Sequence, residues 1–185
     1  YSDSNGFLWI ATYGGGLVRY DGYGMMMPML GLNSLSCKSM TEDKFKRLWV
    51  AFDEGTNVID LNTMLPVVPK TSKGDISEIL AQPSVKTYCD ALGRIWLITT
   101  RYVNLISFDD DGEISNVATY QYTDNTPDIS ICDIEGNGKP WICIDRGLYR
   151  MAVKDGKLVR EEISSLLKPL YGLYITDMLK RGNVV

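Results

Sequence analysis

Apolar residues occur in short runs that repeat four times along the chain. In each run a tryptophan is followed by two successive apolar positions, so both faces of the predicted strand must be covered. These pairs are Ile10 and Ala11, Val50 and Ala51, Leu97 and Ile98, and Ile142 and Cys143. A turn rich in glycine or charged residues follows each run, and a second apolar run comes after the turn. The pattern predicts a β-hairpin in each of the four places.

The tryptophans give the period of this repeat. Trp9, Trp49, Trp96 and Trp141 are separated by 40, 47 and 45 residues. Shorter β-like runs lie between the hairpins, for example residues 129–132 and 174–176, so each period holds about four short strands. Four antiparallel strands, buried on both faces and repeated at this spacing, are typical of propeller blades. We therefore expect an all-β chain: a β-propeller fragment of about four four-stranded blades, with each tryptophan packed between neighbouring blades.

The predicted domain is one partial β-propeller over residues 1–185. Its repeats are expected at residues 1–33, 34–83, 84–127 and 128–172, and a fifth begins at 173–185. An aspartate stands six residues before the first three tryptophans, and Asp133 stands eight residues before the fourth. An aspartate side chain is suited to opening a turn there. The rival architecture, stacked helices, needs apolar residues three and four apart, and only residues 161–170 come close to that pattern.

Composition and charge narrow the function. The chain has 19 Lys and Arg against 23 Asp and Glu, a net charge of −4, which argues against a nucleic-acid partner or direct binding to a membrane surface. No apolar run approaches the ~18 residues that a membrane-spanning helix needs. Attachment to a membrane is therefore expected only through segments of the protein outside residues 1–185.

Residues that usually carry catalysis or bind metals are few. Histidine is absent, which removes the commonest general base and metal ligand. The four cysteines have no CxxC spacing, so they are interpreted as small buried hydrophobes, with a disulfide as the alternative. The acidic loop at 133–138 begins like a calcium loop, but Ile144 stands where the closing glutamate should be, so a hairpin turn is favoured. We expect no catalytic residue, no metal and no cofactor.

The first repeat carries a family resemblance. Residues 5–21, NGFLWIATYGGGLVRYD, resemble the repeat of the two-component regulator propeller family, in which a G-x-L-W-I-G-T run precedes G-L-x-R-Y-D. The other three repeats match more loosely: Phe52 replaces the threonine, Asn104 replaces a glycine, and Pro140 precedes the fourth tryptophan after a two-residue insertion. The resemblance covers essentially the whole chain.

This resemblance implies a sensor. Similar repeats form the extracytoplasmic region of hybrid two-component systems in Bacteroides-type bacteria, ahead of a histidine kinase and a response regulator. Their usual ligands are oligosaccharides, and their output is transcription of glycan-utilisation genes. The resemblance thus implies a periplasmic, non-enzymatic ligand-sensing segment. The alternatives are a protein interaction scaffold and a propeller lyase or hydrolase.

The predicted binding residues lie in the loops that follow the tryptophan strands. Equivalent loops of radial repeats emerge on one face, and these loops supply aromatic, acidic and basic side chains suited to sugars. They are Tyr13, Asp53, Glu54, Arg101, Tyr102, Asp145 and Arg146. The simpler interpretation is that exposed turns are polar in any case.

Two further expectations concern exposed edges. The run of methionines at 25–29 is interpreted as an outer-edge or interface segment, because Pro28 argues against a central strand, and the alternative is that the methionines fill gaps in the core. The segment 174–185 repeats the strands around the tryptophan position, so it could supply a missing strand to the first blade, either of its own chain, which would close a small four-bladed ring, or of a partner. We therefore expect a homodimer that completes a ring of about eight blades through terminal strands.

Overall fold

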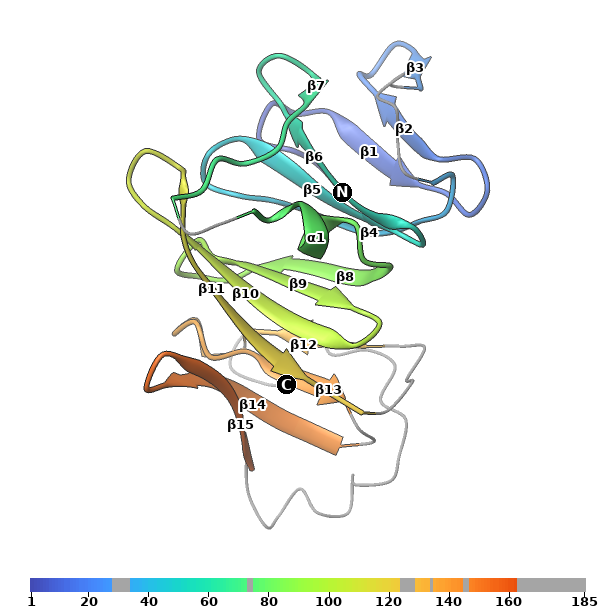
Figure 1. Ribbon diagram of the computed structural model, residues 1–185. Helices are drawn as coiled ribbons and strands as arrows, with labels where there is room; N and C mark the ends of the chain where they lie inside the picture. The colour runs from blue at the N-terminus through green and yellow to red at the C-terminus, as the bar shows by residue number, and fades with distance from the viewer. Residues whose placement is uncertain (28–33, 73–74, 124–128, 134, 145–146, 163–185) are drawn as a thin grey trace.

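The computed structural model describes residues 1–27, 34–72, 75–123, 129–133, 135–144 and 147–162. These residues form four antiparallel sheets in which each strand pairs only with its neighbours in the sequence (Figure 1). The sheets are successive blades, so the prediction of an all-β propeller fragment of four blades is confirmed. The strands are β1 (Leu8–Ala11), β2 (Leu17–Tyr20) and β3 (Met25–Met26) in the first blade; β4 (Cys37–Glu42), β5 (Arg47–Phe52), β6 (Gly55–Asp60) and β7 (Leu65–Pro66) in the second; β8 (Ser84–Cys89), β9 (Ile95–Thr99), β10 (Tyr102–Phe108) and β11 (Ile114–Gln121) in the third; and β12 (Ile131–Cys132), β13 (Trp141–Ile144), β14 (Gly147–Lys154) and β15 (Lys157–Glu162) in the fourth.

The first blade is built with three strands rather than the expected four. Ser2 forms an isolated antiparallel bridge with Leu8, and the Trp9 amide donates to the Tyr1 carbonyl at 2.7 Å. Residues 1–2 thus take the place of a first strand. Met25 and Met26 form the outer strand β3 and are exposed, which confirms the outer-edge interpretation for these two residues. Met29 lies outside the described residues.

The hydrophobic core lies between the blades rather than within any one of them. One cluster joins Trp9 and Leu17 of the first blade to Phe52 and Leu48 of the second. The next cluster joins the second blade to the third, and another joins the third to the fourth. The second and third blades are packed on two sides, and the two residues after the tryptophan are buried there, whereas Ile10 and Ala11 of the first blade are not.

Each tryptophan occupies the second strand position of its blade, pairing with the third. Trp49, for example, is opposite Val58, and Trp96 is opposite Leu105. Trp9, Trp49 and Trp96 are at most 2% exposed. Each packs in the cluster shared with the following blade. Trp141 is only partly buried.

A buried aspartate builds the turn before each of the first three tryptophans. In the third blade, Asp90 Oδ1 accepts the backbone N–H groups of Leu92 and Arg94, both at 3.0 Å. Asp90 Oδ2 accepts Arg94 Nε and the Trp96 indole Nε1, both at 2.9 Å. Asp43 repeats all four bonds in the second blade, and Asp3 makes the two backbone bonds and the indole bond in the first. The turn that the sequence predicted therefore also holds the tryptophan in place.

The same turns connect successive blades. Arg47 Nη1 donates to the Gly112 carbonyl of the third blade at 2.7 Å, and its guanidinium lies 4.6 Å from the centre of the Phe108 ring. Arg94 Nη2 donates to the Gly138 carbonyl of the fourth blade. Asn5 Nδ2 of the first blade reaches the Leu61 carbonyl of the second at 3.1 Å. In each of the first three blades, the aspartate turn before the tryptophan is thus bonded to the blade that follows.

The connection between the second and third blades contains a short helix, α1 (Ser77–Leu80), which the sequence pattern did not predict. The connection first reaches the third blade, where the Ile114 amide donates to the Lys70 carbonyl at 2.7 Å. It then turns back, and the Asp75 carboxylate accepts the Ser77 amide at the start of α1. Ile76 and Leu80, four residues apart, are buried between the two blades. This contact, rather than helix propensity, explains a helix of four residues.

Several other expectations can be placed in the structure. All four cysteines are free, so the alternative of a disulfide is not realised, and burial raises the pKa of the Cys37 thiol to about 12. Within the described ranges, no helix is long and apolar enough to cross a membrane. The segment 173–185, predicted to begin a fifth repeat, and most of 161–170 lie outside those ranges.

Candidate functional site

The loops that join the second and third strands lie at one end of the blades. Figure 1 shows the β1–β2, β5–β6 and β9–β10 loops on the right, opposite the aspartate turns. They hold Tyr13, then Asp53 and Glu54, then Arg101, and Tyr102 is the first residue of β10. Asp145 and Arg146, the predicted residues of the fourth blade, lie outside the described residues. The shared topology thus places the described residues at one end of the blades. Tyr13 and Asp53 lie where the first and second blades meet, and Arg101 lies on the third blade.

Tyr13 and Asp53 are held on either side of one backbone segment. Tyr13 forms an isolated bridge with Ser36, and the Asp53 amide donates to the Ser36 carbonyl at 3.3 Å. The Tyr13 side chain is 91% exposed. The Asp53 carboxylate forms an ion pair with Lys38, at 2.5 Å, on the first strand of the same blade. The backbones of Tyr13 and Asp53 are therefore both anchored at Ser36, and their two segments carry an exposed ring and a paired carboxylate and ammonium group.

Arg101 and Tyr102 lie at the corresponding position of the next blade. The Arg101 carbonyl accepts the Tyr122 amide at 3.1 Å, and the Tyr102 amide donates to Thr99 Oγ1 at 3.1 Å. These backbone bonds fix the loop while the Arg101 side chain stays exposed. No ion pair or hydrogen bond found between described residues joins this loop to Asp53 or Glu54.

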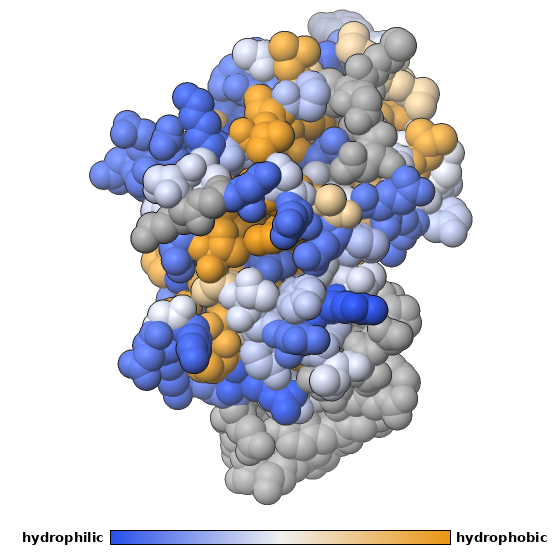
Figure 2. Space-filling view, in the orientation of Figure 1, coloured by the Kyte–Doolittle hydropathy of each residue, from blue (hydrophilic) through white to orange (hydrophobic). Residues whose placement is uncertain are grey.

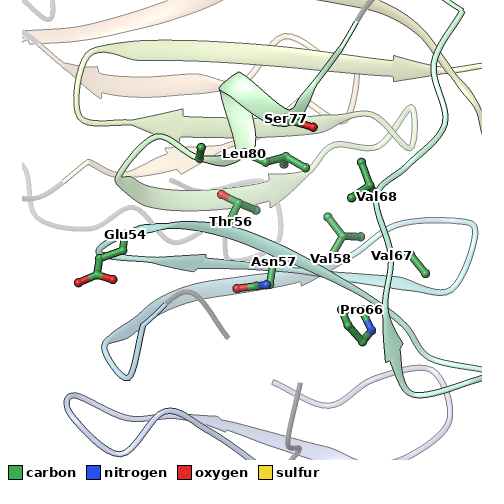
Figure 3. A pocket seen from close by; sticks show the side chains of 10 residues that line it. Glu54, Thr56, Asn57, Val58, Pro66, Val67, Val68, Ser77 and Leu80 are labelled. Atoms are coloured by element: carbon green, nitrogen blue, oxygen red, sulfur yellow. The ribbon is translucent and has the colours of Figure 1, made fainter. Parts of the chain in front are cut away.

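Glu54 lies at the rim of a groove on the outer part of the second blade. The groove has a volume of about 490 Å³, within the range of ~300–1,000 Å³ usual for ligand pockets. Strand β6 lines one side, the chain after β7 another, and α1 a third (Figure 3). The lining residues are Glu54, Thr56, Asn57, Val58, Pro66, Val67, Val68, Ser77, Leu80 and Ala81. Figure 2 shows hydrophobic surface over this part of the molecule, where Val68 is exposed.

The sequence reasoning missed Lys38 and the groove. A lysine inside a short, otherwise half-buried strand was the available signal for Lys38, which sits where the register of β4 and β5 shifts. The groove had no comparable signal, because α1 and residues 66–68 are brought to β6 only by the path of the connection. The acidic loop at 133–138, whose start resembles a calcium loop, is held by hydrogen bonds of a turn, in which Asp133 Oδ2 accepts the Gly138 amide. The acidic segment at 109–113 is a turn of the same kind, in which Asp109 Oδ1 accepts the Asp111 and Glu113 amides.

Comparisons with known proteins bear on the fold. No protein-family model matches the chain, and a search of curated proteins finds no match. Among solved structures, the extracellular domain of a hybrid two-component system of B. thetaiotaomicron matches 88% of this chain with a TM-score of 0.55 and 15% identity. The virginiamycin B lyase of Staphylococcus aureus matches 89% with a TM-score of 0.59 and 13% identity. A 6-phosphogluconolactonase of Bacteroides uniformis matches 83% with a TM-score of 0.57 and 14% identity.

The chain spans only part of these proteins. It corresponds to 28% of the sensor domain, 55% of the lyase and 53% of the lactonase. The extracellular sensor domains to which the sequence resemblance pointed are thus among the structural matches. At these identities the likeness concerns the fold, and the chain is a β-propeller segment of the fold that those sensor domains share with propeller lyases.

Proposed function

We propose that the chain is a ligand-sensing, extracytoplasmic propeller segment of a hybrid two-component sensor. The observation that carries the proposal is the pair of exposed side chains, Tyr13 and Arg101, at the same end of the blades on loops fixed by backbone bonds. Side chains that are free in solution but rigidly presented are suited to binding from the solvent. The likeness to the extracellular sensor domain supports the same role.

The ligand class we propose is an oligosaccharide. An exposed tyrosine ring can stack on the C–H face of a sugar, and a guanidinium can donate charge-assisted hydrogen bonds to hydroxyl oxygens. The Lys38 and Asp53 pair adds a donor and an acceptor next to Tyr13. Binding would then control glycan-utilisation genes through a histidine kinase in another part of the protein, with this segment in the periplasm.

We propose binding rather than catalysis for this chain. The lyase matches include a histidine-to-alanine variant of virginiamycin B lyase that is catalytically inactive. This chain has no histidine to place in such a role. An all-carboxylate hydrolase would need two carboxylates facing one cavity, whereas Glu54 is the one carboxylate that lines the described groove.

The test is thermal unfolding of the chain in the presence of a panel of oligosaccharides. A ligand present at 100 times its dissociation constant adds about 2.7 kcal/mol to the free energy of unfolding, which a melting curve resolves. The Tyr13→Ala and Arg101→Ala variants should lose this shift. Tyr23→Ala is the matched control, because Tyr23 is 99% exposed but lies in the β2–β3 turn at the opposite end of the blade.

Two results would contradict the proposal. A sugar-dependent rise in melting temperature that persists in both loop variants would mean that the binding site lies elsewhere. No shift with any oligosaccharide, together with binding of a folded partner protein, would favour an interaction scaffold.

We also propose a homodimer completed by the terminal strands at 174–185. Light scattering at micromolar concentration should give twice the 20.8 kDa chain mass. A monomer mass, or a dimer that persists when residues 174–185 are deleted, would contradict it.

A further inference from the structure

The groove of the second blade lies where the outer strand runs in the third and fourth blades. In the third blade β11 pairs with β10 from Tyr102 to Phe108, and in the fourth β15 pairs with β14 from Tyr149 to Lys154. In the second blade the outer strand β7 pairs only with Ile59 and Asp60, and one further bond joins the Val67 amide to the Val58 carbonyl at 2.8 Å. The chain then leaves β6, so residues 55–57 have no strand on their outer side in the described structure.

The backbone groups along this edge point into the groove. The Val58 and Asp60 carbonyls accept bonds on the outer side of β6, from Val67 and Met64. In an antiparallel strand every second residue points its N–H and C=O the same way, so Thr56 also points both groups outward. No described residue forms a backbone bond with them. This edge offers a donor and an acceptor to an added strand.

We propose that this groove binds an extended peptide of a partner protein, which adds to β6 as an antiparallel outer strand. A peptide strand is favoured because the same position is occupied in the third and fourth blades by β11 and β15, which pair along the full edge of their blades. Addition of a strand to an exposed edge obtains its affinity from backbone hydrogen bonds and its specificity from alternate side chains.

The walls of the groove define the side chains of the peptide. Leu80, Val58 and Val67 provide an apolar wall, suited to one aliphatic residue facing α1. The Glu54 carboxylate lies at the rim and has no ion-pair partner among the described residues. Because the added strand continues the direction of β7, its C-terminal end lies beside Glu54. A lysine or arginine at that end therefore fits the charge.

The experiment selects ligands from a library of randomised eight-residue peptides displayed on phage, using the whole chain as target. Peptides that bind this groove should carry an aliphatic residue followed towards the C-terminus by a basic one. Methylating alternate backbone nitrogens of a selected peptide should weaken binding at least about tenfold, because it removes the strand hydrogen bonds. Hydrogen exchange at the Thr56 amide should slow when the peptide binds.

Matched variants locate the site. Ala81→Arg places a long cation in the groove and should weaken the same peptides at least about tenfold, whereas Ala91→Arg, at an exposed alanine of the β8–β9 turn, should not. Glu54→Lys should weaken basic peptides by about three- to tenfold, and Asp110→Lys, in the β10–β11 turn, should not.

Three outcomes would overturn the proposal: no peptide that prefers the wild-type chain to Ala81→Arg, binding unchanged by backbone methylation, or a sugar response lost in Ala81→Arg while peptides bind normally. The oligosaccharide proposal is tested separately by Tyr13→Ala, so either can fail without the other.

Discussion

The turn before the tryptophan strand is built differently in the third and fourth blades. In the third, six residues separate Asp90 from Trp96, and the carboxylate accepts two amides, an arginine and the indole. In the fourth, eight residues separate Asp133 from Trp141, and Asp133 accepts the Gly138 amide at 2.8 Å and the Asn137 amide at 3.3 Å. The Trp141 Nε1 atom is buried with no partner among described residues.

The indole bond follows the spacing, because the three blades with six-residue spacing have it and the fourth does not. The third and fourth blades both have an aspartate, a glycine turn and a tryptophan. Each carboxylate accepts two amides of its own turn, but in the fourth blade the Asp133 Oδ2 atom accepts amides of Gly138 and Ala91 in place of an arginine and the indole. A buried donor without an acceptor costs roughly 1–3 kcal/mol, which the fourth blade bears and the third does not.

The largest expected difference comes from removing the aspartates. Asp90→Ala leaves a partly buried arginine and three other donors without their acceptor and should lower the free energy of unfolding by about 3–5 kcal/mol. Asp133→Ala removes backbone bonds only and should cost about 1–2 kcal/mol. Urea unfolding followed by tryptophan fluorescence measures both. Equal losses would mean that the two turns are energetically alike.

Replacing the tryptophans separates packing from the indole bond. Trp96→Phe should cost about 1–3 kcal/mol more than Trp141→Phe, because only the first leaves a carboxylate oxygen short of a donor. Chemical denaturation of the two variants, compared with wild type, gives the difference. A greater loss at Trp141 would contradict the assignment of its Nε1 as unpaired.

Shortening the fourth turn should make it resemble the third. Deletion of Glu135 and Gly136 restores the six-residue spacing, so Trp141 Nε1 should gain an acceptor worth about 1 kcal/mol. The indole N–H resonance of Trp141 should then exchange with solvent as slowly as we expect for Trp96, whose indole is bonded to Asp90. The matched control is insertion of two glycines after Ala91, which should destabilise the third blade.

The smallest effect concerns the thiol beside Asp90. Burial, and then the carboxylates of Asp90, Asp43 and Glu42, raise the pKa of Cys89 to about 11 from 9.0. The folded state therefore holds its proton above pH 9, where the unfolded state releases it, so stability is retained below pH 9 and lost as the pH rises to 11. Because the thiol is partly exposed, the loss should be at most about 1 kcal/mol.

Cys89→Ala should reduce this alkaline slope between pH 9 and 11, measured by urea unfolding at each pH. Cys143→Ala should reduce the slope in a similar way, since burial raises the pKa of Cys143 to about 11 as well. Identical slopes in wild type and Cys89→Ala would contradict the role of this thiol.

The repeat could be predicted from the sequence because every blade needs the same packing on both faces. The tryptophan spacing and the paired apolar positions that follow it reflect a contact between neighbouring blades that the described structure repeats three times. The aspartate turns were also predictable, since an aspartate side chain caps local amides. That Asp43 and Asp90 also accept the indole was not predicted, because it depends on a side chain six residues away folding back.

Helix α1 and the groove could not be predicted, because they depend on contacts between segments that are distant in the sequence. Helix α1 forms because Ile76 and Leu80 fill a gap between two blades. A helix of four residues is too short to produce a helical period in the sequence. The groove at β6 likewise results from where β7 ends. For the candidate sugar site, the loops of the sequence analysis lie at one end of the blades as topology requires, while the binding role of their side chains stays a prediction.

Three side-chain bonds that the aspartate turns of the first three blades make to another blade point the same way along the chain. Asn5, Arg47 and Arg94 each donate to the following blade, so each blade is clamped by its predecessor. Such a stack behaves as a one-dimensional array in which a unit is stable chiefly through its nearest neighbours. Damage to one turn therefore weakens the junction on its C-terminal side first, and the array divides there into two cooperative blocks rather than melting uniformly.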